Sequence, residues 1–295
     1  RLLGEADIVA AVQAARAADV ALVFAGLNAE WDNEGLDRPG ITLPYRQDEL
    51  IARVAAANPR TVVVLQTGSP VALPWLAAVP AVLQAWYPGQ ECGDAIADLL
   101  LGVQEPGGRL PQTWPLRLGD GVAQADARCY PGVDGAVHYD EGVFIGYRHH
   151  AQRGIAAAFA FGHGLSYSRF EHSDLQLDRD RLRPGDVLSL QTTVRNVGPR
   201  PGQEVVQVYV HDVAASVARP PYELKAFAKV ALAPGESRRV RLRLAMRAFA
   251  FFDPARRAWV AEAGAFELRV GSSSDVWQQR AQVVLEADWL DPVSA

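Results

Sequence analysis

Cysteines and long apolar runs are both scarce in this sequence. Two cysteines, Cys92 and Cys129, are too few for a disulfide framework and fit either one bridge or two free thiols. No apolar run reaches the length of a membrane span, and the first residues lack the basic, apolar, small-residue order of a signal peptide. These absences predict a soluble chain with no membrane contact. They leave the oligomeric state open, together with cytoplasmic, periplasmic and secreted locations.

The sequence also lacks the side-chain clusters that bind nucleic acids, metals or nucleotides. The formal net charge is −5 and the arginines are scattered, so no basic surface for nucleic acid is predicted. His163 is isolated, and the adjacent His149 and His150 have no further ligands at metal spacing. The glycines of "EPGGRLP" lack the spacing of a phosphate loop, and "QTGSP" lacks the elbow of a nucleophilic serine. The sequence therefore predicts no metal and no cofactor.

The period of the hydrophobic pattern changes along the chain. From residue 5 to 115, amphipathic helical segments alternate with short apolar segments such as "DVALVFAG" and "RTVVVLQTG". This alternation predicts βαβ units and a mainly parallel sheet. After residue 170, segments such as "SRRVRLRLA" alternate apolar and polar residues, which predicts an antiparallel β-sandwich. The predicted fold class is α/β plus all-β, with an αβ sandwich at 1–117, an irregular linker and junction at 118–169, and a β-sandwich at 170–295.

The loop "NAEWDNEGLDRPG", residues 28–40, combines four carboxylates with one tryptophan directly after an apolar strand. Ligands of parallel sheets bind beyond the carboxyl ends of the strands, where this loop is expected to lie. Glu30 and Glu34 are candidates for general acid or base work, and Trp31 is a candidate shield that raises a carboxyl pKa. The alternative is a solvated acidic loop in which Asp37 and Arg38 form a local ion pair. Among the other tryptophans, Trp86 is the best candidate for a pocket wall.

Five ordered segments extend over nearly the whole chain and carry a family resemblance. They are "NEGLDR", "QTGSPVALPW", "AWYPGQECGDAIADLLLGVQEPGGRLPQTWP", "FAFGHGLSYSRF" and "VARPPYELKAFAKVALAPGES". Together they resemble the C-terminal part of glycoside hydrolase family three, the β-glucosidase-like enzymes. The resemblance implies an αβ sandwich followed by a fibronectin type III-like domain. Ala160 departs from the family's usual Phe-Pro-Phe-Gly, without an expected effect on the chemistry.

The resemblance also implies residue roles and partners. Glu34 aligns with the acid/base of the family's Glu-Gly-x-Asp-Arg loop, and Glu30 is the second choice. Trp31 is expected near the substrate, with Asp37 and Arg38 supporting the loop. The implied reaction is retaining hydrolysis that removes non-reducing-end β-D-glucose from a β-glucoside or oligosaccharide. The nucleophile is expected in an N-terminal barrel that is absent from these residues, so the fragment alone is expected to be inactive.

Several alternatives stay open at this point. A non-catalytic carbohydrate-binding or scaffold module would keep the same fold without the enzyme. Within the enzyme class, β-xylosidase and N-acetylglucosaminidase activities are alternatives to β-glucosidase. The segments "SSSDVW" and "ADW" look similar to the family's nucleophile motif, but they occur at the far end of the predicted sandwich and are interpreted as decoys.

Overall fold

The computed structural model describes residues 3–293, which divide into two compact units. Unit 1 extends to residue 103 and includes 114–121, whereas unit 2 comprises 104–113 and the chain from 122 onward. Mixed parallel and antiparallel sheets in these units confirm the predicted fold class. The domain boundaries at 117 and 169 remain a prediction.

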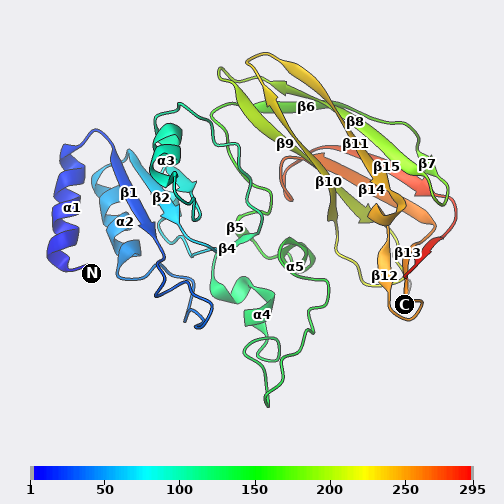
Figure 1. Cartoon of the computed structure of the whole chain (residues 1–295), viewed down its shortest axis with the longest axis horizontal. Helices are drawn as coiled ribbons and strands as arrows, with labels where there is room; N and C mark the ends of the chain where they lie inside the picture. The colour runs from blue at the N-terminus through cyan, green and yellow to red at the C-terminus, as the bar shows by residue number, and fades with distance from the viewer. Residues whose placement is uncertain (1–2, 294–295) are drawn as a thin grey trace. The chain divides into compact units, whose positions relative to one another are not determined.

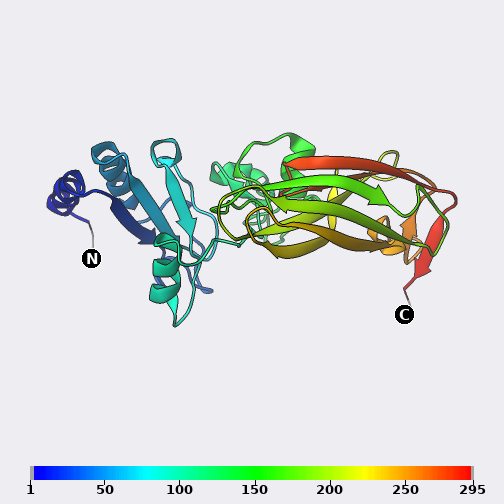
Figure 2. The same cartoon turned by 90° about the horizontal axis from the view of Figure 1, so that it is seen from above.

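Unit 1 is built on a three-stranded parallel sheet with strand order β1-β2-β3 (Figure 1). Figure 2 shows α2 on one face of this sheet and α3 on the other. The apolar segments predicted as strands therefore form the sheet, and the amphipathic segments form helices, of which α2 contacts β1 and β2 while α1 packs on α2. The elements are α1 (Glu5–Ala17), β1 (Ala21–Gly26), α2 (Gln47–Ala57), β2 (Thr61–Gln66), η1 (Leu76–Ala78), β3 (Ala81–Gln84), α3 (Cys92–Leu100), β4 (Trp114–Pro115) and η2 (Leu118–Asp120).

Strand β1 is covered on one face only. Its segment is almost entirely apolar, yet Leu22 and Phe24 are 49% and 54% exposed. The intervening Val23 and Ala25 are buried, so only one face of β1 is covered. β1 is an edge strand of the sheet, and α2 contacts it on the covered face. The sheet therefore positions the acidic loop from a strand that is half exposed.

The segment before the sandwich is largely irregular and contains short regular elements. These are α4 (Val122–Ala125), α5 (Tyr147–Arg153) and β5 (Ala157–Phe159). Helix α5 ends at Gly154, which has a φ of +63°. A glycine adopts this left-handed conformation without steric cost, so it terminates the helix cleanly.

The antiparallel sandwich of unit 2 has period-2 burial along its strands. In β11, Val240, Leu242 and Leu244 are buried while the intervening arginines are exposed. The main sheet has order β10-β9-β14-β15-β7, and a second sheet has order β11-β8-β6 (Figure 1). One apolar core contains buried residues from both sheets. The strands are β6 (Phe170–Leu177), β7 (Arg181–Leu182), β8 (Val187–Asn196), β9 (Gly202–Asp212), β10 (Glu223–Leu232), β11 (Ser237–Ala245), β14 (Gly264–Gly271) and β15 (Trp277–Leu285).

A small third sheet completes unit 2. It has strand order β12-β13-β16, and both of its pairings are antiparallel. The 3-10 helix η3 contacts β13. The bounds are η3 (Met246–Ala248), β12 (Phe251–Asp253), β13 (Ala258–Ala261) and β16 (Trp289–Pro292). The segment "SSSDVW" follows β14 and ends at the first residue of β15, and "ADW" lies after β15 and ends at the first residue of β16.

The structure also describes the cysteines and the side chains of the types that bind metals. Cys92 and Cys129 are both free thiols. Between residues 3 and 293, no group of three or more His, Cys, Asp or Glu side chains is placed to hold a metal ion. Within the same residues, none of the helices has the length and apolar content needed to cross a membrane.

Candidate functional site

The acidic loop begins with a tight turn at the carboxyl end of β1. The carbonyl of Asn28 accepts hydrogen bonds from the amides of Trp31 and Asp32, both at 2.9 Å. The side-chain oxygen of Asn28 accepts a third bond from the Glu30 amide at 3.1 Å. Asparagine favours such turns because its side chain hydrogen-bonds backbone two residues further on. This turn fixes the direction in which the acidic residues leave the sheet.

A second asparagine builds the next turn and places Glu34 at its tip. Asn33 Oδ1 accepts a hydrogen bond from the Gly35 amide at 3.0 Å, and Asn33 forms a β-bridge with Leu36. Its side-chain nitrogen donates to the Ala29 carbonyl at 3.3 Å, which joins the second turn to the first. Glu34 is exposed, and its carboxylate has no hydrogen bond or ion pair within residues 3–293. The loop therefore presents the Glu34 carboxylate, which has no partner within residues 3–293, at the tip of a hydrogen-bonded turn.

Glu30, the second candidate, is in a different situation. Its carboxylate accepts a short hydrogen bond from the hydroxyl of Tyr45. The Tyr45 ring also meets Trp31 edge to face, with centroids 5.8 Å apart. Trp31 packs on Tyr45 and Glu34 is exposed, and the role of Trp31 as a shield stays a prediction. The indole nitrogen of Trp31 is buried without a hydrogen-bond partner in the described chain.

Asp32 ties the loop to the segments that follow β2 and β3. It accepts hydrogen bonds from the Tyr87 hydroxyl at 2.6 Å and from the Gly68 amide at 3.3 Å. Partial burial and, to a smaller extent, the neighbouring Asp32 carboxylate raise the pKa of Tyr87. The phenol therefore stays protonated and donates a hydrogen bond to Asp32. A Cβ at Gly68 would lie 2.8 Å from atoms of both partners. A larger residue at this position would therefore have to displace the Asp32 or Tyr87 side chain.

Arg38 closes the loop on its other side. Its guanidinium donates to the Ser69 hydroxyl at 2.8 Å and, at 3.5 Å, to the carbonyl of Pro70. A second guanidinium nitrogen is buried with no hydrogen-bond partner among the described residues. Asp37, the preceding residue, lies on the exposed side of the loop. Arg38 thus joins the loop to the segment after β2, and its role as loop support stays a prediction.

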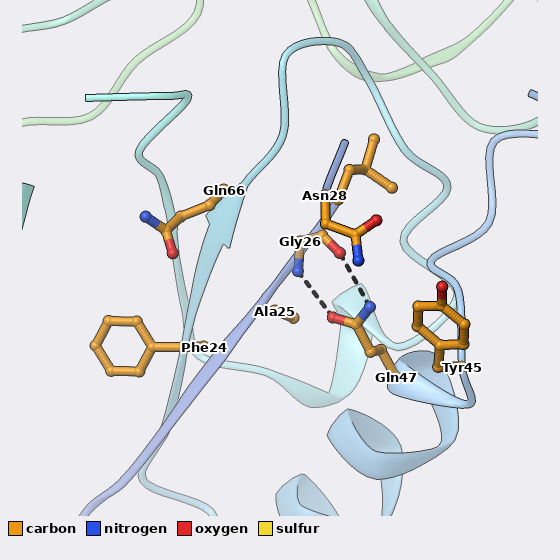
Figure 3. A pocket seen from close by; sticks show the side chains of 8 residues that line it. Phe24, Ala25, Gly26, Asn28, Tyr45, Gln47 and Gln66 are labelled. Carbon is orange, nitrogen blue, oxygen red and sulfur yellow. Dashed lines mark hydrogen bonds between the residues drawn. The ribbon is translucent and has the colours of Figure 1, made fainter. Parts of the chain in front are cut away.

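A cavity of about 230 Å³ lies beside the loop, at the same edge of the sheet. In Figure 3, the side-chain amide of Gln47 pairs with the backbone of Gly26, through bonds of 2.8 and 2.9 Å. Tyr45 lines this cavity and also binds Glu30, so the cavity and the loop share a wall. Trp86 does not line it, because its ring packs edge-on against buried Trp114. The prediction of Trp86 as the wall of a pocket is thus not supported for this cavity.

Sequence reasoning missed three members of the site. Tyr45, Gly68 and Tyr87 lie between 15 and 55 residues from the loop residues that they contact. Tyr45 and the next residue, Arg46, also adopt positive φ angles of 59° and 66°, which no pattern in the sequence indicates. A hydrogen bond between a hydroxyl and a carboxylate that are far apart in the sequence is visible only in the folded chain.

The class of protein follows from these observations together: an αβ layer with an acidic loop at its sheet edge, joined in one chain to a fibronectin-like sandwich. Residues 3–167 match the glycosyl hydrolase family 3 C-terminal domain, and residues 204–274 match the fibronectin type III-like domain. The chain belongs to glycosyl hydrolase family 3, which confirms the resemblance.

The relatives are similar over nearly all of this chain but extend well beyond it. The chain is 50% identical over 273 residues to a β-glucosidase of Rhizobium radiobacter, a match that covers 92% of this chain and 33% of that protein. It is 44% identical over 264 residues to thermostable β-glucosidase B of Acetivibrio thermocellus, covering 90% and 35%. The chain thus spans about a third of the length of the curated relatives that it matches.

Solved structures agree with these matches. The β-glucosidase of Kluyveromyces marxianus, in complex with glucose, superposes with a TM-score of 0.90 at 38% identity, covering 97% of this chain and 34% of that one. The family 3 β-glucosidase of Bifidobacterium adolescentis gives 0.91 at 36% identity, covering 100% and 43%. At these identities, the similarity extends to sequence as well as fold.

Proposed function

We propose that this chain is the acid/base-bearing part of a retaining β-glucosidase and that Glu34 is the acid/base. The observation that carries the assignment is the contrast between the two candidate carboxylates. Glu34 lies unoccupied at the tip of a braced turn, whereas the Glu30 carboxylate is held by Tyr45. A group that transfers a proton to and from substrate has to be free to meet it.

The proposed reaction needs a second carboxylate, and we assign it to a barrel outside these 295 residues. In a retaining mechanism the nucleophile attacks the anomeric carbon while Glu34 donates a proton to the departing glycosidic oxygen. Glu34 then removes a proton from the water that releases the sugar. Because Glu34 is exposed here, we assign its shielding from bulk water to the barrel and to bound substrate. Trp31, whose side chain is only partly buried, is the proposed contact to the leaving group.

The test uses the protein in which this chain is joined to its barrel. Replacing Glu34 by Ala should slow the hydrolysis of alkyl glucosides by about a hundred- to ten-thousand-fold, because their leaving groups need protonation. Activated aryl glucosides, which leave without a proton, should lose far less in the bond-breaking step. Azide should restore their turnover, since it attacks the glycosyl-enzyme without being deprotonated.

Glu30→Ala is the matched control, four residues away in the same loop. We expect it to lower turnover by an amount that does not depend on the leaving group, because Glu30 acts through the loop. Azide rescue of Glu30→Ala without rescue of Glu34→Ala would transfer the assignment to Glu30. Rescue of neither, with no leaving-group dependence, would show that the acidic loop only shapes the pocket and that neither glutamate is the acid/base.

A further inference from the structure

A second cavity of about 600 Å³ lies entirely within unit 2. This volume falls within the range of roughly 300–1,000 Å³ typical of small-molecule sites. None of its lining residues belongs to the acidic loop. The lining comes from Thr113, from α5 and the segment that follows it to His163, from Tyr222 just before β10, and from the turn between β14 and β15.

One wall of this cavity is apolar and has little side-chain bulk. It consists largely of alanines, with Ile155 and Phe159 at its larger positions. The Phe159 ring stacks on the His163 imidazole, with centroids 5.0 Å apart. Small side chains leave room for a flat apolar face of a ligand. The alanines are Ala151, Ala156, Ala157, Ala158 and Ala160.

The other wall carries polar groups with unused hydrogen-bonding capacity. The Thr113 hydroxyl is buried without a partner among the described residues, which is uncommon in folded proteins. Nδ1 of His150 donates to the Ile155 carbonyl at 3.1 Å, so in the neutral imidazole Nε2 remains an acceptor. Asp275 uses one carboxylate oxygen to accept a bond from the Ser273 hydroxyl at 2.6 Å, and its side of the cavity is exposed.

The aromatic border of the cavity is held rigidly. The Tyr222 ring lies nearly parallel to Tyr147 at 6.1 Å and meets Trp277 edge-on at 4.8 Å. The guanidinium of Arg269 lies over the same Tyr222 ring, 5.4 Å from its centroid. A site whose walls are ordered in advance loses less conformational entropy when a ligand binds.

The charge of the lining limits the class of ligand. Asp275 is acidic, and neither lysine nor arginine occurs among the described residues that line the cavity. Burial lowers the pKa of His163, so its imidazole is neutral at pH 7. Without a cation, the cavity does not suit phosphates or carboxylates. It suits a neutral molecule with one apolar face and several hydroxyl groups.

We propose that this cavity binds a neutral saccharide of one or two pyranose units. The C–H face of a sugar ring packs on the alanine wall, and its hydroxyls donate to Asp275 and to Nε2 of His150. The Thr113 hydroxyl gains the partner that it lacks. The use of glucosides as first probes rests on the proposed function, whereas the choice of a neutral saccharide rests on the cavity.

The experiment titrates the 295-residue chain with methyl β-D-glucoside and with cellobiose while backbone amide shifts are recorded. We expect saturable shifts at Ser274 and Asp275 and in the segment 154–163. Glucose 6-phosphate, which carries a charge next to the carboxylate, should bind at least tenfold more weakly. Equal binding of the phosphate would overturn the charge argument, and no saturable shift at tens of millimolar sugar would overturn the site.

Three variants connect the binding to the cavity. Asp275→Asn should weaken it roughly tenfold to a hundredfold, since a hydrogen bond to a charged group is lost. Ala156→Phe, at an exposed lining position, should block it without disturbing the core. Glu34→Gln should leave it unchanged, which separates this result from any failure of the proposed catalytic role. Shifts that disappear in Glu34→Gln but persist in Asp275→Asn would assign the sugar to the acidic loop and refute the proposal.

Discussion

The hydrogen bond between Tyr87 and Asp32 predicts how firmly the acidic loop is held. Tyr87→Phe removes one hydroxyl, and among residues 3–293 Asp32 then keeps its longer bond from the Gly68 amide at 3.3 Å. A hydrogen bond to a carboxylate contributes about 1.5 to 3 kcal/mol. Because the Tyr87 side chain is 53% exposed, water replaces part of this and we expect about 1 kcal/mol. Such a loss raises the open population of the loop roughly fivefold.

Amide hydrogen exchange of residues 29–36 in the 295-residue chain measures this population directly. The exchange of these amides should become about fivefold faster in Tyr87→Phe, while amides in the sandwich stay unchanged. Tyr139→Phe is the matched control, because Tyr139 is 82% exposed and lies outside unit 1. Equal loop exchange in Tyr87→Phe and the wild-type chain would show that Asp32 does not hold the loop.

Two further predictions concern stability. Asn58 donates hydrogen bonds of 2.9 Å to two carbonyls at the end of α1, so Asn58→Ala should lower the stability of unit 1 by about 2 kcal/mol. The control Asn33→Ala should lower it by less than about 0.5 kcal/mol. Amide hydrogen exchange in α2 measures both changes. Burial raises the pKa of Glu223, but Lys225 and Arg219 outweigh this effect, so its folded-state pKa lies below the reference value of 4.5. Unit 2 should therefore lose stability as the pH falls below about 4.5, which urea titrations at a series of pH values measure. Glu223→Gln should make stability depend less steeply on pH in this range. An unchanged pH dependence in the variant would contradict the prediction.

Much of the fold is predictable because burial leaves a periodic trace in the sequence. In β11, arginines alternate with Val240, Leu242 and Leu244, and the strand forms where this pattern indicates it. Strand β1 shows the limit of the same reasoning. Leu22 and Phe24 are apolar, but no pattern within the strand reveals that one face of this edge strand remains exposed.

The position of the site is more predictable than its internal contacts. A loop that leaves a parallel strand has to emerge at the carboxyl edge of the sheet, so the place of residues 28–40 follows from the topology. The partner of Glu30 does not follow, because Tyr45 reaches it through a backbone with two consecutive positive φ angles. The partner of Asp32 is Tyr87, which is brought close only when β3 pairs with β2.

The two glutamates of the loop differ because each follows a different asparagine-built turn. Glu30 lies inside the first turn, where its carboxylate faces Tyr45 and would have to break that bond before it met a glycosidic oxygen. Glu34 lies at the tip of the second turn, and the braces of the loop hold its backbone while they leave its side chain unoccupied. The fixed contacts come from Asp32 and Arg38, on either side of Glu34. The loop thereby separates the residues that hold the backbone from the residue that is free to react, which supports the assignment of Glu34 as the acid/base.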